Sequence, residues 1–318
     1  MQIHQTGTFR EALTAVLGAP PDPAPLQPQV LDVVVERGYR REHVKYQAGL
    51  GDWCYAYLLV PLNLSAAAPT IFCHHRQGRY AIGKSEMAGL EGDPNEAVGV
   101  ELVRRGYVVL APDAIGYGER RSAQSSGESY DAAFANHQLS LRLLRGETLL
   151  RKLLWDVSCG IDYLETRSEV DSRFVGFVGH GYGGGMAVWS AAMEGRITAA
   201  VAHGGVITYR EQLRRGLWFQ PEFVVPRLMQ VADMHHVLSL VAPRPFLLSV
   251  ATPAQGADTA EIYDKARAVY DKQGVANRLA LYRYADVTHA DGGVAPDVLR
   301  SHMRQSIYAW LDSWLKPF

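Results

Sequence analysis

The stretch FVGFVGHGYGGGMAVW is the part of the chain whose residue types and spacing point most directly to chemistry. An apolar run leads through a turn containing Gly179, Gly181, Gly183 and Gly184 into a helical pattern. Two motifs fit such a strand–turn–helix unit. One is the dinucleotide fingerprint G-x-G-x-x-G, which holds a pyrophosphate at a helix N-terminus. The other is the nucleophile elbow G-x-S-x-G, in which Gly181 would stand where the serine is expected.

The dinucleotide interpretation lacks the acidic residue that should accompany the glycine motif. It requires an acidic residue about 20 positions further on, at the tip of the next strand, to bind the ribose hydroxyls. Here that strand ends in AVAHGGV, which contains no carboxylate. An NAD-binding protein that uses GHGYGG therefore remains a minor alternative, and no cofactor is expected. Glycines at such a turn also permit close packing of helix on sheet, whichever motif is correct.

Six segments follow one another in an order that is informative as a set. They are CHHRQG, GKSEMAGLEGDP, RRGYVVLAPDAIGYGERR, VGHGYGGG, APRPFLLSV and THADGG, followed by a final amphipathic helix ending in AWLDSWL. In this order they resemble the α/β-hydrolase family, in particular its dienelactone-hydrolase and acetyl-esterase-like branch. The resemblance covers nearly everything from about Tyr46 to Phe318. It implies a chain order of nucleophile, acid and histidine.

By that resemblance, Gly181 occupies the nucleophile position, Asp258 is the acid and His289 is the catalytic histidine. His289 follows the expected strand 279–284, on a loop beyond the carboxyl edge of the sheet, where functional groups of open α/β sheets gather. The loop ATPAQGAD places Asp258 later than is usual in the family, so Asp264 and Asp286 are lesser candidates for the acid. If that loop is not an insertion, Ala254 holds the acid position and the acid is missing.

The resemblance also implies an oxyanion hole and a pocket wall. The backbone N–H of Tyr182 and one N–H from the loop around His75 and Arg76 would point at a substrate oxygen. His180 is expected beside the sheet or at the pocket wall, without a chemical role. Trp218 and Phe219 are expected either to line an apolar pocket or to form the core of a small cap.

Gly181 changes the expected chemistry because glycine has no Oγ. The covalent acyl-enzyme route is closed at this position. In a comparable hydrolase, loss of the nucleophile costs about 10⁶ in turnover. A preorganised cavity would remain, with N–H donors, the positive end of a helix and His289 as general acid or base. Such a site can polarise a carbonyl group and move a proton without a covalent intermediate.

Three explanations of Gly181 remain open. In the first, a natural enzyme uses His289 for non-hydrolytic chemistry on a small molecule of secondary metabolism, as a lyase, a cyclase or a catalyst of carbon–carbon bond formation. In the second, a serine esterase or lactonase has been engineered Ser→Gly to trap substrate. In the third, the chain is a catalytically dead ligand-binding protein. The first is slightly favoured, because alanine is the usual engineered replacement.

Other residues carry weaker chemical hypotheses. Cys73 is a candidate thiolate nucleophile, but a cysteine inside an apolar strand is normally buried and inert. The pairs His74-His75 and His235-His236 suggest a metal site, because imidazole is a common metal ligand. Adjacent side chains of an extended strand point to opposite faces, so neither pair could bind one ion if extended, and no metal is expected. Lys84, Glu86 and Asp113 are interpreted as a framework that fixes the oxyanion loop.

The elements needed to position these residues follow from hydrophobic periodicity. Strands are expected at 30–35, 43–47 and 53–60 as an antiparallel meander, after a helix at 8–17 and a Pro-rich linker. From residue 69, buried strands alternate with helices, which predicts a mostly parallel sheet with helices on both faces. The strands are expected at 71–75, 107–113, 174–178, 197–202, 245–250 and 279–284, and the helices at 95–106, 147–166, about 184–193, 260–272 and 296–315. We therefore expect one α/β domain over 1–318, with residues 1–28 as N-terminal helix and linker. Residues 209–243 are expected as a cap or excursion.

The composition limits the function classes. The chain has 318 residues, a net charge of −1, 47% hydrophobic residues and three cysteines. The near-zero charge excludes a broad electrostatic affinity for nucleic acid or anionic membranes. No apolar run approaches the ~18 residues of a membrane span, and no basic start precedes an apolar stretch. We expect a cytoplasmic protein with a small-molecule substrate, and a homodimer is compatible with the sequence.

Overall fold

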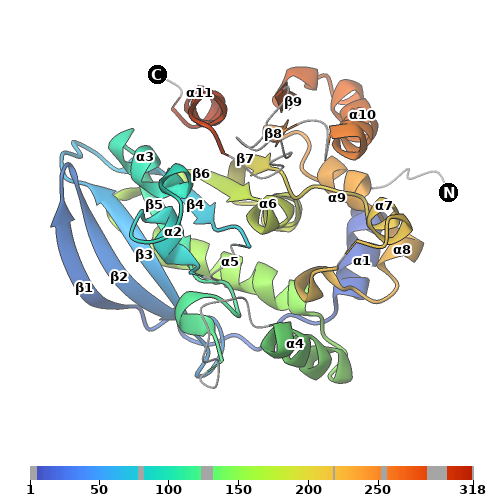
Figure 1. Cartoon of the computed structure of the whole chain (residues 1–318), viewed down its shortest axis with the longest axis horizontal. Coiled ribbons are helices and arrows are strands. Elements are labelled where there is room, and N and C mark those ends of the chain that lie inside the picture. The colour runs from blue at the N-terminus through green and yellow to red at the C-terminus, as the bar shows by residue number, and fades with distance from the viewer. Residues whose placement is uncertain are drawn as a thin grey trace, which may run out of the picture.

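The structure is a computed structural model that describes residues 6–77, 82–122, 132–217, 219–251, 256–284 and 299–316. Over these residues, nine strands form one sheet in the order β1-β2-β3-β5-β4-β6-β7-β8-β9 (Figure 1). The strands are β1 (Gln29–Glu36), β2 (Tyr39–Gln47), β3 (Trp53–Pro61), β4 (Ala68–His74), β5 (Val108–Pro112), β6 (Val170–His180), β7 (Ile197–His203), β8 (Phe246–Ala251) and β9 (Leu279–Tyr284).

The sheet combines an antiparallel end with a parallel remainder. β1, β2 and β3 pair as an antiparallel meander, and β3 also pairs antiparallel with β5. From β5 through β4, β6, β7, β8 and β9, all neighbouring strands are parallel. The carboxyl ends of these parallel strands therefore meet at one edge of the sheet, where the turns and loops that could carry chemistry lie.

Helices cover both faces. Those described are α1 (Thr6–Leu17), α2 (Lys84–Met87), α3 (Val98–Arg104), α4 (Ala132–Leu144), α5 (Leu149–Glu165), α6 (Tyr182–Met193), α7 (Tyr209–Arg214), α8 (Leu228–Val231), α9 (Met234–Ser239), α10 (Gly256–Lys272) and α11 (Ser301–Leu315), with 3₁₀ turns η1 (Pro94–Glu96), η2 (Gly118–Arg120), η3 (Pro221–Phe223) and η4 (Ala276–Arg278). Buried side chains of α3 and α11 share one apolar core, and those of α1, α5, α6, α9 and α10 share the other. Figure 1 shows α3 and α11 on the opposite side of the strands from α5 and α6.

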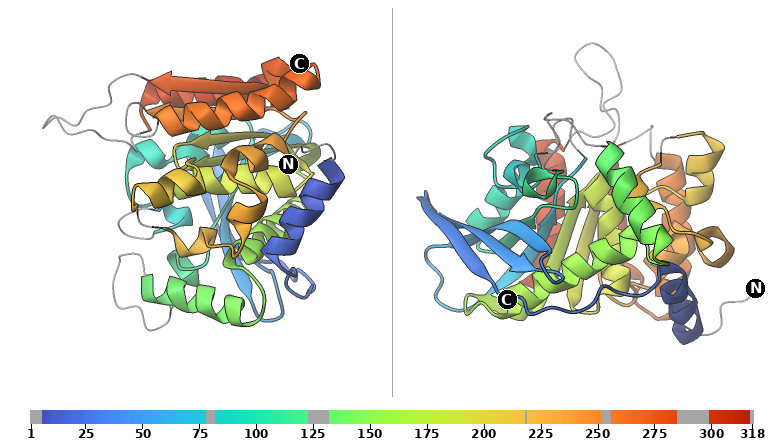
Figure 2. Two further views of the ribbon diagram at one scale, coloured as in Figure 1. Left: turned by 90° about the vertical axis from the view of Figure 1, so that its right-hand side faces the viewer. Right: turned by 90° about the horizontal axis from the view of Figure 1, so that it is seen from below.

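The fold class expected from the sequence is confirmed: a mostly parallel α/β sheet with helices on both faces and antiparallel N-terminal strands. The β1–β2 ribbon projects at one end of the molecule, and α1 lies at the other (Figure 2). Some boundaries differ from the prediction. β6 begins at Val170 rather than at residue 174, α6 begins at Tyr182 rather than at about residue 184, and α4 was not predicted.

The expected excursion over residues 209–243 contains α7, η3, α8 and α9, which are short helices. α9 packs against α6 and α10, and α8 packs against α1. The segment therefore lies on the α6 side of the sheet. That this segment forms a cap remains a prediction. No helix in the described part of the chain is long and apolar enough to cross a membrane.

Candidate active site

The turn between β6 and α6 has the geometry of a nucleophile elbow. β6 ends at His180, α6 begins at Tyr182, and Gly181 between them has φ 54° and ψ −112°. A positive φ is strained for residues other than glycine. A Cβ built at Gly181 would nevertheless meet only the Cβ of Arg76, at 3.7 Å, within ordinary van der Waals contact. The position therefore has room for a side chain that the sequence does not supply.

The neighbouring backbone approaches the elbow so closely that only glycine fits beside it. Gly205, which follows β7, has φ +67°, and a Cβ there would lie 1.7 Å from the carbonyl oxygen of Gly181. Gly181 in turn donates its N–H to the carbonyl oxygen of His203 at 2.9 Å. The end of β7 thus fixes the elbow from one side.

A cavity of about 230 Å³ opens at the elbow. Its lining residues come from the loop after β4, from the elbow, and from segments that follow β7: Arg76, Gln77, His180, Gly181, Tyr182, Gly205, Ile207, Gln212, Gln220 and Phe223. The structure therefore brings together four residues that the sequence analysis assigned to the site: Arg76, His180, Gly181 and Tyr182. Phe223 packs edge-on against the Tyr182 ring, with ring centroids 5.7 Å apart.

The beginning of α6 faces this cavity with main-chain donors. The first N–H groups of a helix have no partner in its own ladder, and Gly181 provides no side-chain cap. The helix has 12 residues, so its dipole also favours negative charge at this end. These features are compatible with an oxyanion-hole role for the Tyr182 N–H, and that role remains a prediction.

His75 acts through its side chain as a bridge between two loops. Its ring is fully buried; Nδ1 donates to the carbonyl oxygen of Arg76 at 2.9 Å, and Nε2 accepts from the N–H of Ala114 at 3.1 Å. Burial lowers the pKa of His75 to about 4, so the ring is neutral near pH 7. His75 is not among the cavity-lining residues, and only its backbone remains a candidate for the oxyanion hole.

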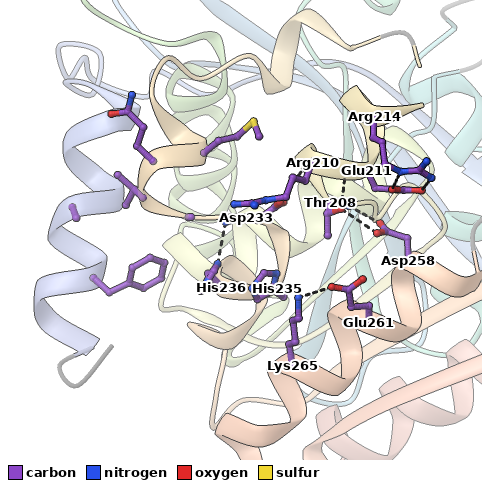
Figure 3. Close-up of a pocket in the computed structure, with 16 residues that line it drawn as sticks. Thr208, Arg210, Glu211, Arg214, Asp233, His235, His236, Asp258, Glu261 and Lys265 are labelled. Atoms are coloured by element: carbon purple, nitrogen blue, oxygen red, sulfur yellow. Dashed lines mark hydrogen bonds and ion pairs between the residues drawn. The ribbon is translucent and has the colours of Figure 1, made fainter. Parts of the chain in front are cut away.

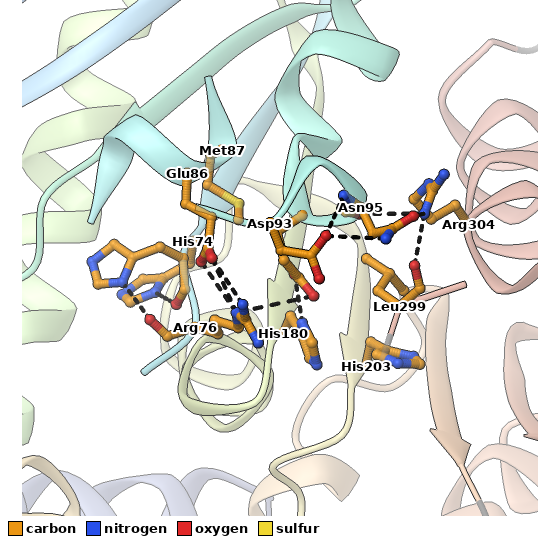
Figure 4. A network of polar contacts seen from close by, with 12 residues as sticks. His74, Arg76, Glu86, Met87, Asp93, Asn95, His180, His203, Leu299 and Arg304 are labelled. Carbon is orange, nitrogen blue, oxygen red and sulfur yellow. Dashed lines mark hydrogen bonds and ion pairs between the residues drawn. The ribbon is translucent and has the colours of Figure 1, made fainter. Parts of the chain in front are cut away.

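Buried ion pairs hold the loop after β4. Arg76 donates to Glu86 at 2.9 Å, and the Glu86 side chain is 3% exposed (Figure 4). Lys84 Nζ pairs with Asp113 Oδ2 at 2.5 Å, and both side chains are buried. Charge-assisted hydrogen bonds of this kind are strong and directional. These contacts tie Arg76 to α2 and α2 to the end of β5, and the expected role of Lys84, Glu86 and Asp113 in fixing the oxyanion loop remains a prediction.

A carboxylate–imidazole pair that was not foreseen lies directly before Gly181. Glu96 Oε2 lies 2.7 Å from His180 Nδ1, and the exposed fractions are 0% for Glu96 and 4% for His180. The His180 ring is labelled in Figure 4. His180 Nε2 is buried and has no hydrogen-bond partner in the described part of the chain. Glu96 is separated from His180 by more than 80 positions, and no local pattern in the sequence pairs them.

Asp258 lies in a different cavity. It is in the first turn of α10, and its carboxylate accepts from the backbone N–H of Thr208 at 2.6 Å and from the Thr208 hydroxyl at 3.0 Å (Figure 3). Burial raises the pKa of Asp258. Its cavity, of about 830 Å³ between α1, α7, α8, α9 and α10, shares no lining residue with the cavity at Gly181. Asp258 thus anchors the start of α7, and its role as catalytic acid remains a prediction.

Several expected site residues lie elsewhere or cannot be placed. Phe219 is not in the cavity at Gly181; it packs against Tyr209, with ring centroids 5.3 Å apart, because the chain folds back onto α7 there. His289, Trp218, Asp286 and Ala254 lie outside the described residues.

Two minor hypotheses can be compared with the structure. Burial raises the pKa of the Cys73 thiol to about 12, which leaves it unionised and unreactive near pH 7.

His235 and His236 lie on α9 rather than on an extended strand, and their ring centroids are 3.9 Å apart. The argument that adjacent side chains point to opposite faces therefore does not hold for this pair. Within the described ranges, no group of three or more His, Cys, Asp or Glu side chains is arranged to hold a metal ion.

The sheet order and the glycine elbow define a protein of the α/β-hydrolase fold, which confirms the resemblance seen in the sequence. Residues 84–234 match the model of the Dienelactone hydrolase family. Over 315 residues the chain is 29% identical to the Bacillus subtilis (strain 168) protein named "Putative hydrolase YtaP", covering 95% of this chain and 98% of that protein.

Solved structures of esterases share this fold. One is described as a "putative acetyl xylan esterase" from Bacteroides fragilis NCTC 9343, with a TM-score of 0.77, 17% identity, and coverage of 96% of this chain and 86% of that chain. Another is a glucuronoyl esterase from Solibacter usitatus, with a TM-score of 0.68, 17% identity, and coverage of 97% and 92%. At such identities the likeness establishes the fold alone.

Proposed function

We propose that this chain is an enzyme that acts on the carbonyl group of a small-molecule ester bound beside Gly181, without a serine nucleophile. The observation that carries the proposal is the elbow itself: Gly181 has the positive φ and the free side-chain space that a nucleophile at the start of α6 would need. The N–H groups at that helix end would stabilise negative charge on the carbonyl oxygen. His289 would serve as general base or acid.

The lining favours an ester with a hydroxyl-rich alcohol part. Gln77 and Gln220, which hydrogen-bond to each other, provide amide donors and acceptors, and Arg76 adds further donors. The volume of about 230 Å³ is below the ~300–1,000 Å³ typical of sites for larger ligands, which favours a short acyl group. Two solved structures of similar fold are named acetyl xylan esterase and glucuronoyl esterase. A sugar ester is the substrate class that these observations support best.

Ester hydrolysis is favoured over the lyase, cyclase and carbon–carbon bond-forming alternatives, because the named relatives are hydrolases and esterases. The water that attacks the ester would stand in the space left by the absent hydroxymethyl group. Turnover should then be far below that of a serine esterase, since the covalent intermediate is missing.

The substitution Gly181→Ser tests the proposal. We expect it to raise the rate of p-nitrophenyl acetate hydrolysis by at least about 10³-fold, because a restored Oγ recovers part of the ~10⁶ that loss of a nucleophile costs. Gly195→Ser is a matched control, since Gly195 also has open space around it but lies at the far end of α6. A folded Gly181→Ser protein that stays inert on aryl acetates and on acetylated xylo-oligosaccharides would contradict the proposal.

A further inference from the structure

The pair formed by Glu96 and His180 has the geometry of a proton-transfer unit. Glu96 Oε2 accepts from His180 Nδ1 at 2.7 Å, which fixes the ring orientation and places the proton of a neutral ring on Nδ1. Nε2 is then an acceptor with a free lone pair. A buried carboxylate that orients an imidazole in this way also stabilises the imidazolium formed when Nε2 takes up a proton.

The free nitrogen needs a partner that the described chain does not provide. His180 is 4% exposed, and its Nε2 is buried without a hydrogen bond among the described residues. Buried polar atoms in folded proteins are nearly always hydrogen-bonded. His180 also lines the cavity that contains Gly181. Because Nε2 is itself buried, a water molecule is the suitable partner for it.

Charged and polar groups surround the pair. The Arg76 guanidinium lies between two carboxylates: it pairs with Glu86 at 2.9 Å, and its Nε is 4.0 Å from Glu96 Oε1. One negative charge therefore remains uncompensated in this group when His180 is neutral. On the other side, the His203 ring packs edge-on against His180, with centroids 4.9 Å apart, and its Nδ1 lies 2.8 Å from Ser249 Oγ.

We propose that His180, oriented by Glu96, is a second catalytic residue of this site and transfers a proton during ester cleavage; this rests on the proposed function. Nε2 accepts a proton from a water molecule while the water oxygen forms a bond to the ester carbonyl carbon. The bond from that carbon to the alkoxy oxygen then breaks, and the proton passes from Nε2 to the departing alkoxide. The products are a carboxylic acid and an alcohol, and His180 returns to its neutral form.

The substitution His180→Asn separates this role from a structural one. The Asn side chain can still donate a hydrogen bond toward Glu96 but has no counterpart of Nε2. We expect the full-length His180→Asn protein to hydrolyse p-nitrophenyl acetate about 10²-fold more slowly than wild type with KM unchanged, and to lose the acid limb of the rate profile between pH 5 and pH 9. Glu96→Gln should lower kcat by about tenfold and keep that limb. His137→Gln, at an exposed position on α4, is the control.

Chemical rescue provides a readout that a structural role would not give. After subtraction of the rate that imidazole alone gives with p-nitrophenyl acetate, imidazole added to His180→Ala should restore hydrolysis in proportion to the neutral imidazole present, whereas Glu96→Gln should show no such gain. The His180→Ala variant also serves if His180→Asn fails to fold. If His180 has only a structural role, its Nε2 binds a buried water in the void of about 10 Å³ bordered by His180, His203 and Leu299. His180→Asn would then keep the wild-type kcat and pH profile, which would overturn the proposal.

Two further outcomes separate this inference from the proposed function. If wild type is no faster than buffer while Gly181→Ser is active, the ester-binding elbow is supported, but ester cleavage without a serine and the role of His180 are both rejected. If Gly181→Ser brings no gain but the wild-type rate depends on His180, the elbow assignment fails and the role of His180 is retained.

Discussion

At Gly181, the backbone conformation favours glycine, whereas the surrounding space would accept a larger residue. Its φ of 54° favours glycine, whereas the nearest atom to an added Cβ is 3.7 Å away, so the space itself would accept a side chain. At Gly205 both demands agree, because an added Cβ would collide with the Gly181 carbonyl. The absence of a side chain at residue 181 is therefore not enforced by crowding.

This difference predicts the stability of two variants. Gly181→Ala should lower the free energy of unfolding by about 1–3 kcal/mol through backbone strain alone. Gly205→Ala should cost more, because the backbone of β6 and α6 must move. Urea denaturation followed by circular dichroism measures both. Gly195→Ala, at an open position without positive φ, should remain within about 0.5 kcal/mol of wild type. Equal losses at positions 181 and 195 would contradict the strain argument.

At the scale of elements, α7 divides the two cavities. Ile207 and Gln212 line the cavity at Gly181, and Thr208 and Glu211 line the larger one. Two aspartates bind the first N–H groups of this short helix: Asp258 binds Thr208, and Asp233 binds Tyr209. The position of α7 therefore depends on carboxylates from α10 and from the start of α9.

Asp258→Asn should loosen this attachment. The two Asp258 oxygens accept from two separate donors of Thr208, and an Asn side chain offers only one acceptor oxygen. We expect a loss of about 1–3 kcal/mol in the free energy of unfolding and faster amide hydrogen exchange in α7. Asp264→Asn, at an exposed position on the same helix, should have almost no effect. If both variants unfold alike, Asp258 does not anchor α7.

The sequence allowed prediction of elements whose apolar residues follow a clear period. The six parallel strands and the helices α5 and α10 were expected close to where they lie, because both faces of the sheet are buried. α4 was missed because only Ala135 among its residues is buried, so it has no apolar stripe. The pairing of Glu96 with His180 and the location of Phe219 depend on long-range packing, which spacing along the chain does not encode.

For the whole molecule, buried histidines predict acid sensitivity. Burial lowers the pKa of His74 to about 3 and that of His75 to about 4, against ~6.5 in an unfolded chain. Since the unfolded state then binds more protons, the free energy of unfolding should fall as the pH drops below about 6.5, by roughly 2 kcal/mol per histidine between pH 7 and pH 5. Urea denaturation at both pH values checks this.

The variant His75→Gln isolates one of these groups. It should be less stable than wild type at pH 7, because the bridge to Ala114 is altered, but it should lose about 2 kcal/mol less on going to pH 5. His137→Gln should keep the full pH dependence. An unchanged dependence in His75→Gln would show that this histidine is not the source.

The strand order has a consequence for biosynthesis. β4 lies between β5 and β6, both of which come later in the chain, and its Cys73 pairs with Val178, about a hundred residues downstream. β4 can pair with β5 once residues 108–112 have been made, but its other edge stays unpaired until β6 (residues 170–180) has been synthesised. A protein cut short before residue 170 would lack β6, the elbow and the segments after β7, and would therefore lack all lining residues of the Gly181 cavity except Arg76 and Gln77 among those the structure describes.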